Sequence, residues 1–137
     1  MKVVLDTNVL YAALRSNTGA SFQLLSRIGT GAFDIAVSVG LVLEYEEILK
    51  QHVSAFQLSE RDIDDVIDYM CRIAALTEVF FLWRPYLPDP DDDMILELAV
   101  AARCDATVTF NVRDFKGAET FRIRVLTPRQ FLREIES

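Results

Sequence analysis

The amino-acid sequence predicts an α/β protein with three layers, α/β/α, in which helices cover both faces of a central, mainly parallel sheet. Short apolar runs of strand length alternate with longer runs of helical spacing along the whole chain. Acidic and amide side chains directly follow several apolar runs, as ligand-binding residues do in open parallel sheets. No repeat, low-complexity stretch or long linker marks a boundary, so residues 1–137 are expected to form a single domain.

The strands are predicted from short runs rich in apolar and β-branched residues. In the first run, residues 2–5, three apolar residues follow one another, which is typical of a parallel strand buried on both faces. Further strands are expected at residues 33–37, 78–82, 106–110 and 122–126. The gaps between these runs carry the helices, as parallel connections require.

The helices are predicted from apolar spacing and from their start signals. They are expected at residues 20–28 and 39–51, and onward from Ser59, from near Pro90 and from Thr127. Ser59 is a good N-cap, and an apolar stripe at i, i+3 and i+4 spacing runs from there to Ile73. The helix near Pro90 is apolar nearly all round, which predicts burial. Thr127 is a capping residue with Pro128 at the first helical position.

Several classes of protein are excluded by composition. No apolar run is long enough to span a membrane and no signal peptide is indicated, so a cytoplasmic protein is expected. Cys71 and Cys104 form no C-x-x-C pair and His52 is the single histidine, which argues against zinc or a disulfide scaffold. Both cysteines are expected to be buried and His52 to be exposed. Neither common glycine-rich phosphate loop occurs, so phosphate chemistry would depend on a metal ion.

The charge is unevenly distributed. The chain carries a net charge of −7, which argues against nonspecific binding to nucleic acid through bulk electrostatics. Residues 111–133 hold six basic and two acidic residues, a local net charge of +4, and −11 remains for the rest. A polyanionic substrate could approach from the basic side while a cation neutralises the acidic centre. The alternative is an ordinary solvated surface near the C-terminus.

Asp6 ends the first predicted strand. Its side chain is expected to project from the carboxyl edge of the sheet into a ligand-binding crevice, where Thr7 and Asn8 could orient its oxygens. The structural alternative is an N-cap for a helix that starts at Val9.

A second acidic cluster opens the helix near Pro90. Four of the five residues 89–93 are aspartates, whereas a helix start needs one or two acids for capping and for the helix dipole. Carboxylates are the oxygen ligands that Mg²⁺ or Mn²⁺ prefers, so the excess favours a divalent cation. A calcium EF-hand is excluded, because the sixth and twelfth positions from Asp89 are Met94 and Val100.

Two further segments supply polar residues. In the helix at residues 39–51, Glu44 flanks the apolar stripe, whereas Glu46 faces solvent and can pair with Lys50. For Glu44 an ordinary surface helix is the alternative. Asn111 and Asp114 follow the strand at residues 106–110 and stand at another carboxyl edge, although Asp114 could instead serve as a helix cap.

Together these segments resemble the PIN-domain ribonucleases, specifically the VapC-like toxins of toxin–antitoxin pairs. The resemblance covers nearly the whole chain and rests on four segments in order: residues 3–10, 43–49, 89–97 and 108–115. It implies a PIN-like fold and a metal site made by acids from all four segments. Any one segment is weak evidence alone, but their order within one short chain is fairly specific.

The resemblance implies roles for individual residues. The catalytic and metal-binding acids implied are Asp6, Glu44, Asp92 and Asp114, with Asn111 as a further metal ligand. Asp92 is selected over Asp93 by its distance from the first large apolar residue of the helix. The supporting residues implied are Thr7, Asn8, Thr109 and Asp93, and possible RNA contacts are Arg113, Lys116 and Arg122. Many relatives carry aspartate at the position of Asn111, which has no charge and could weaken a second metal position.

The implied activity is hydrolysis of RNA phosphodiester bonds, with one or two Mg²⁺ or Mn²⁺ ions activating water. A cognate antitoxin presenting Arg or Lys to the acidic cleft and a homodimer are the implied partners. Two alternatives stay open. A PIN-fold binding module could have lost activity, with Asn111 as the reason. An aspartate-based phosphotransfer domain is less favoured, because a phosphatase of that kind would have a second aspartate where Asn8 stands.

Overall fold

A parallel sheet of five strands organises the computed structural model of the chain, which describes residues 1–79 and 86–137. The strands are β1 (Lys2–Leu5), β2 (Asp34–Val37), β3 (Ala75–Leu76), β4 (Ala106–Val108) and β5 (Arg124–Leu126). Their order is β3-β2-β1-β4-β5, and every neighbouring pair is parallel. The predicted α/β fold with a parallel sheet is therefore confirmed.

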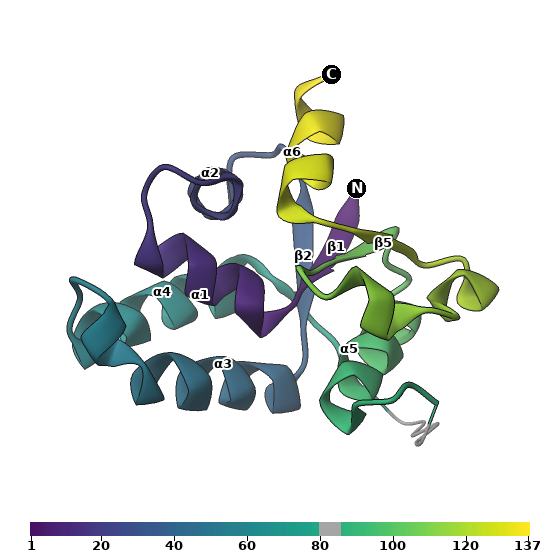
Figure 1. Cartoon of the computed structure of the whole chain (residues 1–137), viewed down its shortest axis with the longest axis horizontal. Coiled ribbons are helices and arrows are strands. Elements are labelled where there is room, and N and C mark those ends of the chain that lie inside the picture. The colour runs from purple at the N-terminus through teal and green to yellow at the C-terminus, as the bar shows by residue number, and fades with distance from the viewer. Residues whose placement is uncertain (80–85) are drawn as a thin grey trace.

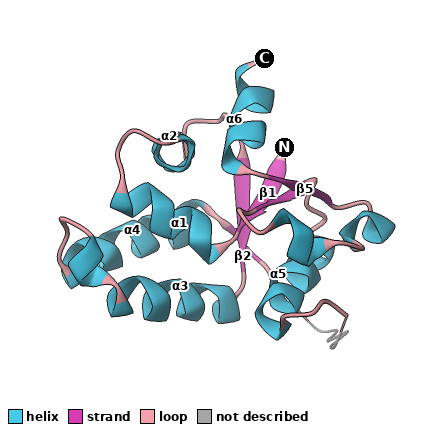
Figure 2. Cartoon of the chain, in the orientation of Figure 1, coloured by secondary structure: helices cyan, strands magenta, loops and turns pink. Residues whose placement is uncertain are grey.

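Helices lie on both sides of this sheet (Figures 1 and 2). The α-helices are α1 (Thr7–Arg15), α2 (Ala20–Ser26), α3 (Val39–Gln51), α4 (Glu60–Ile73), α5 (Pro90–Ala101) and α6 (Pro128–Glu136). Short 3₁₀ segments are η1 (Val53–Ala55), η2 (Val112–Phe115) and η3 (Ala118–Phe121). Helices α1, α3 and α4 gather on one side of β1 and β2, whereas α5 lies on the other (Figure 1). Among the described residues, no helix has the length and apolar character needed to cross a membrane.

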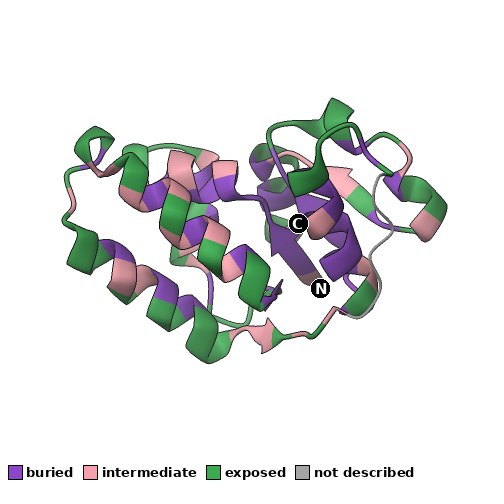
Figure 3. Ribbon diagram, turned by 90° about the horizontal axis from the view of Figure 1, so that it is seen from below, coloured by how far each residue is buried: buried purple, intermediate pink, exposed green. Residues whose placement is uncertain are grey.

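The core is built on the central strands. Val3, Val4 and Leu5 of β1 are buried, as the uninterrupted apolar run predicts, and the neighbouring strand β4 is buried throughout. Figure 3 shows this buried centre between helices that are buried on one side only. Helix α5 also packs into the core, with Ile95 and Leu98 among its buried residues.

Strand register brings the sequence-distant segments together at one edge. Leu5 of β1 pairs with Val108 of β4, so Asp6 and Thr109 come next at the same carboxyl edge. The backbone N–H of Asp6 continues the ladder by donating to the Val108 carbonyl at 2.9 Å. This edge is where open parallel sheets bind ligands.

Several details of the sequence prediction are wrong. A strand was expected at residues 78–82, but β3 is Ala75–Leu76; Glu78 and Val79 lie in no strand, and residues 80–82 fall outside the described part of the chain. Helix α4 ends at Ile73, so β3 begins almost directly after the helix, earlier than the sequence suggested. Cys71 is exposed on α4, although Cys104 is buried as expected. Ile73 is exposed at the end of α4 rather than inside its apolar stripe.

Candidate active site

Asp6 lies at the start of α1, but its side chain makes no cap hydrogen bond to that helix. Its Oδ2 instead accepts hydrogen bonds from the Thr109 hydroxyl at 2.7 Å and from the Asn8 amide at 3.3 Å. The carboxylate is buried, which raises its pKa; the bonds from Thr109 and the Thr7 backbone lower it, and the charges of Asp89 and Asp91 raise it again. The side chain is therefore held toward the site rather than used to start the helix.

Thr109 and Asn8 connect the two strand ends. Thr109 also accepts a hydrogen bond from the Asn111 backbone N–H at 3.0 Å, and the Phe110 N–H donates to the Asn8 amide oxygen at 3.4 Å. The hydroxyl of Thr109 is thus shared between the carboxylate after β1 and the loop after β4. Asn8 was predicted to orient Asp6 and Thr109 to support the site, and both donate to the Asp6 carboxylate.

Glu44 projects from α3 toward the same edge. The Thr7 hydroxyl donates to the Glu44 Oε2, while the Thr7 backbone N–H donates to the Asp6 carboxylate, so this residue contacts both acids. The next residue, Tyr45, is buried and donates its hydroxyl to the Leu5 carbonyl. Burial raises the pKa of Glu44, and the charges of Asp91, Asp6 and Asp89 raise it further against the bond from Thr7.

Helix α3 approaches α5 closely at Gly40. A Cβ at this position would come within 3.1 Å of the Met94 sulfur, so the glycine lets the start of α3 lie near the start of α5. This contact brings the helix of Glu44 to the acidic turn that carries Asp92. Predicted bounds for α3, residues 39–51, match the structure, and Ser38 caps it through the Leu41 N–H at 3.2 Å.

The four aspartates at the start of α5 have different tasks. Asp89 caps the helix by accepting the Asp91 N–H at 3.0 Å. Asp93 is buried and accepts the backbone N–H groups of Tyr86 and Leu87 at 3.2 and 2.7 Å, so it holds the loop before the helix. Asp91 is exposed at the first turn.

Asp92 is left without such a task. It is only 6% exposed, and its Oδ2 is buried with no hydrogen-bond partner among the described residues. Burial raises the pKa of Asp92 to about 7, with further contributions from the charges of Asp6, Asp89 and Asp114. A buried carboxylate oxygen without a partner is costly, and a cation would relieve that cost.

Asn111 and Asp114 follow β4 and are both exposed. Asn111 stands at the start of η2 without a side-chain cap bond, and its carbonyl accepts the Asp114 N–H at 3.0 Å. The negative charge of Asp114 contributes to the raised pKa of Asp92, so the two carboxylates interact across the site. The structure therefore places every predicted acid near the carboxyl edge, from β1, α3, α5 and η2.

The donor set suits a hard divalent cation, since it consists of carboxylate and amide oxygens. In the described part of the chain, no three acidic, cysteine or histidine side chains are already arranged to hold a metal ion. Burial and, to a lesser extent, the neighbouring charges raise the pKa values of Asp6, Glu44 and Asp92. A cation would relieve both effects, and the residues fit Mg²⁺ or Mn²⁺ in chemistry.

Sequence reasoning missed one contributor to this region. Asp91 affects the pKa values of Asp6, Glu44 and Asp92, although nothing in the sequence distinguishes it from its neighbours.

Two of the three predicted basic residues line one cavity. Arg113 and Lys116 line a cavity of about 580 Å³ whose wall includes Val112 of η2 and Ile123 and Val125 near the edge strand β5. Arg122 is exposed at the end of η3 and is not among the lining residues, whereas Arg124 is. Arg124 also pairs with Glu134, so its charge is partly engaged.

Fold and site define an α/β protein whose carboxylates gather at the carboxyl edge of a parallel sheet. The family model of the PIN domain matches residues 2–113. The chain therefore belongs to the PIN-domain family, as the four sequence segments predicted. No curated protein matches the chain in sequence.

Solved structures share the fold over nearly the full chain. One is a chain of VapBC2 from Rickettsia felis bound to a DNA fragment from its promoter, with 16% identity, a TM-score of 0.60, and coverage of 93% of this chain and 98% of that chain. Another is a chain of VapBC-1 from nontypeable Haemophilus influenzae, with 14% identity, a TM-score of 0.63, and coverage of 94% and 99%. A chain of FitAcB from Neisseria gonorrhoeae has 14% identity, a TM-score of 0.56, and coverage of 93% and 98%. At these identities the likeness concerns the fold.

Proposed function

We propose that this PIN-domain chain is a metal-dependent endoribonuclease and the toxin of a toxin–antitoxin pair, acting in the cytoplasm. The observation that carries the activity is the buried, unpartnered oxygen of Asp92, which lies within the electrostatic reach of Asp6 and Asp114. Such an arrangement is costly for stability alone and suits a site that takes a cation. Membership of the PIN family and the shared fold with VapBC and FitAB chains support the biological role.

Asp6, Glu44, Asp92 and Asp114 would hold one or two Mg²⁺ or Mn²⁺ ions, with the Asn111 carbonyl oxygen as a further ligand. When bound, the ion supplies an activated water and neutralises charge that develops on the phosphate. Thr109 and Asn8 keep Asp6 oriented, and Thr7 does the same for Glu44. Asp93 supports the site indirectly by fixing the loop before α5.

The proposed substrate is single-stranded or looped RNA that approaches along the basic cavity. Arg113 immediately precedes Asp114 in η2, and both Arg113 and Lys116 are exposed. Basic side chains are needed near the acids, because a cluster of carboxylates repels an anionic RNA strand. Arg122 remains a proposed contact outside the cavity wall.

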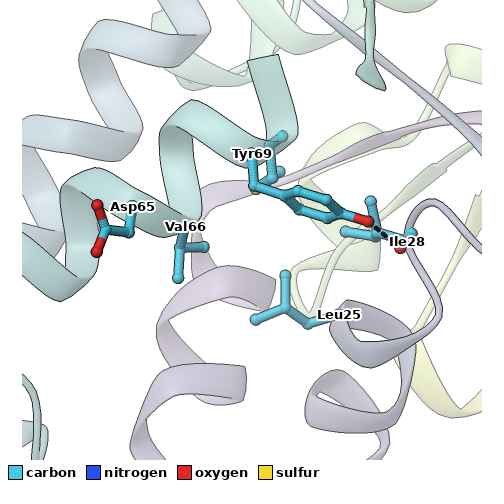
Figure 4. A pocket seen from close by; sticks show the side chains of 6 residues that line it. Leu25, Ile28, Asp65, Val66 and Tyr69 are labelled. Atoms are coloured by element: carbon cyan, nitrogen blue, oxygen red, sulfur yellow. Dashed lines mark hydrogen bonds between the residues drawn. The ribbon is translucent and has the colours of Figure 1, made fainter. Parts of the chain in front are cut away.

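The proposed antitoxin would inhibit by presenting Arg or Lys to the acidic edge, since a desolvated carboxylate cluster needs countercharge. The proposed interface does not include the cavity of about 280 Å³ between α2 and α4, which Figure 4 shows with Leu25, Val66 and Tyr69 around it and Asp65 at one side. A homodimer is proposed on the family resemblance alone.

Cleavage of labelled single-stranded RNA tests the activity. The wild-type protein should cleave it with Mg²⁺ or Mn²⁺ and not with a chelator, and an Asp92→Asn preparation made in parallel controls for contaminating nucleases. A second candidate, a binding module without activity, is favoured by the uncharged Asn111. Binding of RNA by the wild type without cleavage under any metal condition would establish that candidate instead.

A further inference from the structure

Tyr86 connects two loops that carry different acids. It lies in the loop before α5, yet its hydroxyl donates to the Gly117 carbonyl between η2 and η3 at 3.3 Å. Its ring also packs edge-to-face on Phe121 of η3, with centroids 5.3 Å apart and planes at 70°. A single side chain thus reaches from one loop to the other.

The backbone end of Tyr86 is fixed to the acidic turn. Asp93 accepts the N–H groups of both Tyr86 and Leu87, and Leu87 is buried in the core. Asp93 directly follows Asp92 in the first turn of α5. Any shift of Tyr86 is therefore transmitted to the first turn of α5.

At the other end of the Tyr86 side chain, Gly117 lies close to the hydroxyl group. Gly117 has φ +108, in the left-handed region that favours glycine, and a Cβ there would lie 3.2 Å from the Tyr86 hydroxyl oxygen. Absence of a side chain lets the loop approach the tyrosine. Gly117 stands three residues after Asp114, and buried Phe115 anchors η2 itself in the core.

We propose that Tyr86 is a positioning residue that ties the loop of Asp92 to the loop of Asp114 and so sets the spacing of these two carboxylates. The inference rests on the proposed function, in which both acids hold the cation. Asp114 is exposed and belongs to a short 3₁₀ segment, so its position relative to α5 depends on contacts between the two loops. Tyr86 supplies a hydrogen bond and an aromatic contact between them.

The test is Mn²⁺ affinity, measured by isothermal titration calorimetry without RNA, for Tyr86→Phe. This variant keeps the ring on Phe121 and removes the hydroxyl. Loss of groups that orient metal ligands typically weakens affinity by 10-fold or more, and an effect of about 10-fold is expected here. Tyr86→Ala, which removes the ring too, should weaken binding further. In RNA cleavage, Tyr86→Phe should lower kcat and leave KM unchanged.

Tyr69→Phe is the matched control. Tyr69 and Tyr86 are both 44% exposed, and the Tyr69 hydroxyl also donates to a backbone carbonyl, that of Ile28, at 3.2 Å. Tyr69 lies on α4, so its variant loses the same kind of bond without touching the acidic loops. The control should bind Mn²⁺ like the wild type.

Wild-type Mn²⁺ affinity in Tyr86→Phe, or an equal loss in Tyr69→Phe, would overturn the positioning role. Failure of the proposed function looks different: the wild type would bind Mn²⁺ but cleave no RNA, and the titration would still decide the role of Tyr86. A wild type that binds no Mn²⁺ would refute both.

Discussion

The acidic site has two halves that are held in different ways. In the sheet half, made by Asp6 and Glu44, each carboxylate accepts a hydrogen bond from a threonine hydroxyl that itself belongs to a strand end or helix start. In the helix half, made by Asp92 and Asp114, one carboxylate has a buried oxygen without a partner and the other is exposed. The sheet half is therefore organised by the fold, whereas the helix half carries the unrelieved repulsion.

This difference indicates how a cation would act on the site. Hydrogen bonds to Asp6 and Glu44 fix their orientation before any ion arrives, and preorganised ligands lose little freedom on binding. The charged forms of Asp92 and Asp114 would be stabilised most by the ion, because it would supply the positive charge that the protein does not place beside them. The sheet half should therefore control activity, and the helix half should control how metal and pH affect stability.

The largest expected effect comes from the sheet half. Asp6→Asn keeps the shape but removes a charge needed to hold the ion, so RNA cleavage should fall by orders of magnitude while the circular dichroism spectrum stays native. Asp105→Asn is the matched control, because Asp105 accepts the Lys2 N–H at 2.9 Å at the opposite edge of the same sheet. Wild-type cleavage by Asp6→Asn in nuclease-free preparations would refute the hydrolase and leave the binding module.

The helix half should dominate the response of the melting temperature to pH and metal. A pKa of Asp92 raised to about 7 means that the folded protein binds this proton more tightly than the unfolded chain does. Without metal, the melting temperature should therefore fall as pH rises from about 4 to about 7. In Asp92→Asn this fall should be smaller, so that the variant melts several degrees above the wild type near neutral pH.

Mg²⁺ or Mn²⁺ should raise the melting temperature of the wild type, because a ligand that binds only the folded state stabilises it. Asp92→Asn should reduce this response. An unchanged metal-induced shift in the variant would mean that Asp92 is the wrong aspartate. Some pH dependence should persist in the variant, because the other acids that contribute to the electrostatics of the site remain: Asp6, Glu44, Asp89, Asp91 and Asp114.

A smaller effect is expected from the hydroxyl that orients Asp6. Thr109→Val removes the 2.7 Å bond and leaves Asp6 with the weaker Asn8 bond and the Thr7 backbone N–H, so kcat should fall by about 10- to 100-fold. Thr107→Val, two residues earlier on the same strand, is the control. The Thr107 hydroxyl is buried without a hydrogen-bond partner, so this change should leave activity intact and hold or raise the melting temperature. Equal activities of the two variants would contradict an orienting role for Thr109.

The smallest effect belongs to the basic cavity. Arg113→Ala with Lys116→Ala should raise KM several-fold, leave kcat unchanged, and reduce the slope of log Kd against log salt by about 1.4 for single-stranded RNA. Arg61→Ala with Arg72→Ala removes the same charge from exposed positions on α4 and should change neither. If both double variants showed the same change in KM and in salt dependence, the effect would come from net charge and not from a binding surface.

Sequence reasoning recovers the sheet half more fully than the helix half, for a physical reason. The end of an apolar strand fixes where Asp6 lies, and the carboxyl edge of a parallel sheet fixes that Thr109 lies nearby. At the start of α5, four aspartates are alike in sequence, and their tasks differ through the loop that precedes them. Asp93 is engaged by the N–H groups of Tyr86 and Leu87, which leaves Asp92 for the site; its catalytic role stays a prediction.

The remaining errors come from tertiary context. Thr7 bonds to its neighbour Asp6 through its backbone N–H, but its second contact could not be predicted, because α3 brings Glu44 within reach of the Thr7 hydroxyl. Arg122 lies at the end of η3 and does not line the cavity of Arg113, so its contact with RNA stays a prediction. The strand β3 was predicted too late in the chain, at residues 78–82. A strand that pairs with β2 at only two residues leaves almost no local sequence signal.

The lone oxygen of Asp92 also has a consequence for proton exchange. With its pKa raised to about 7, this carboxyl is close to half-protonated in the metal-free protein at neutral pH. A ligand oxygen must be deprotonated to bind a cation, so uptake of the proposed ion near pH 7 should release a fraction of a proton, and apparent affinity should rise with pH. Binding enthalpies measured in buffers of different ionisation enthalpy would differ by that fraction, so proton concentration and metal concentration together set the occupied fraction of the site.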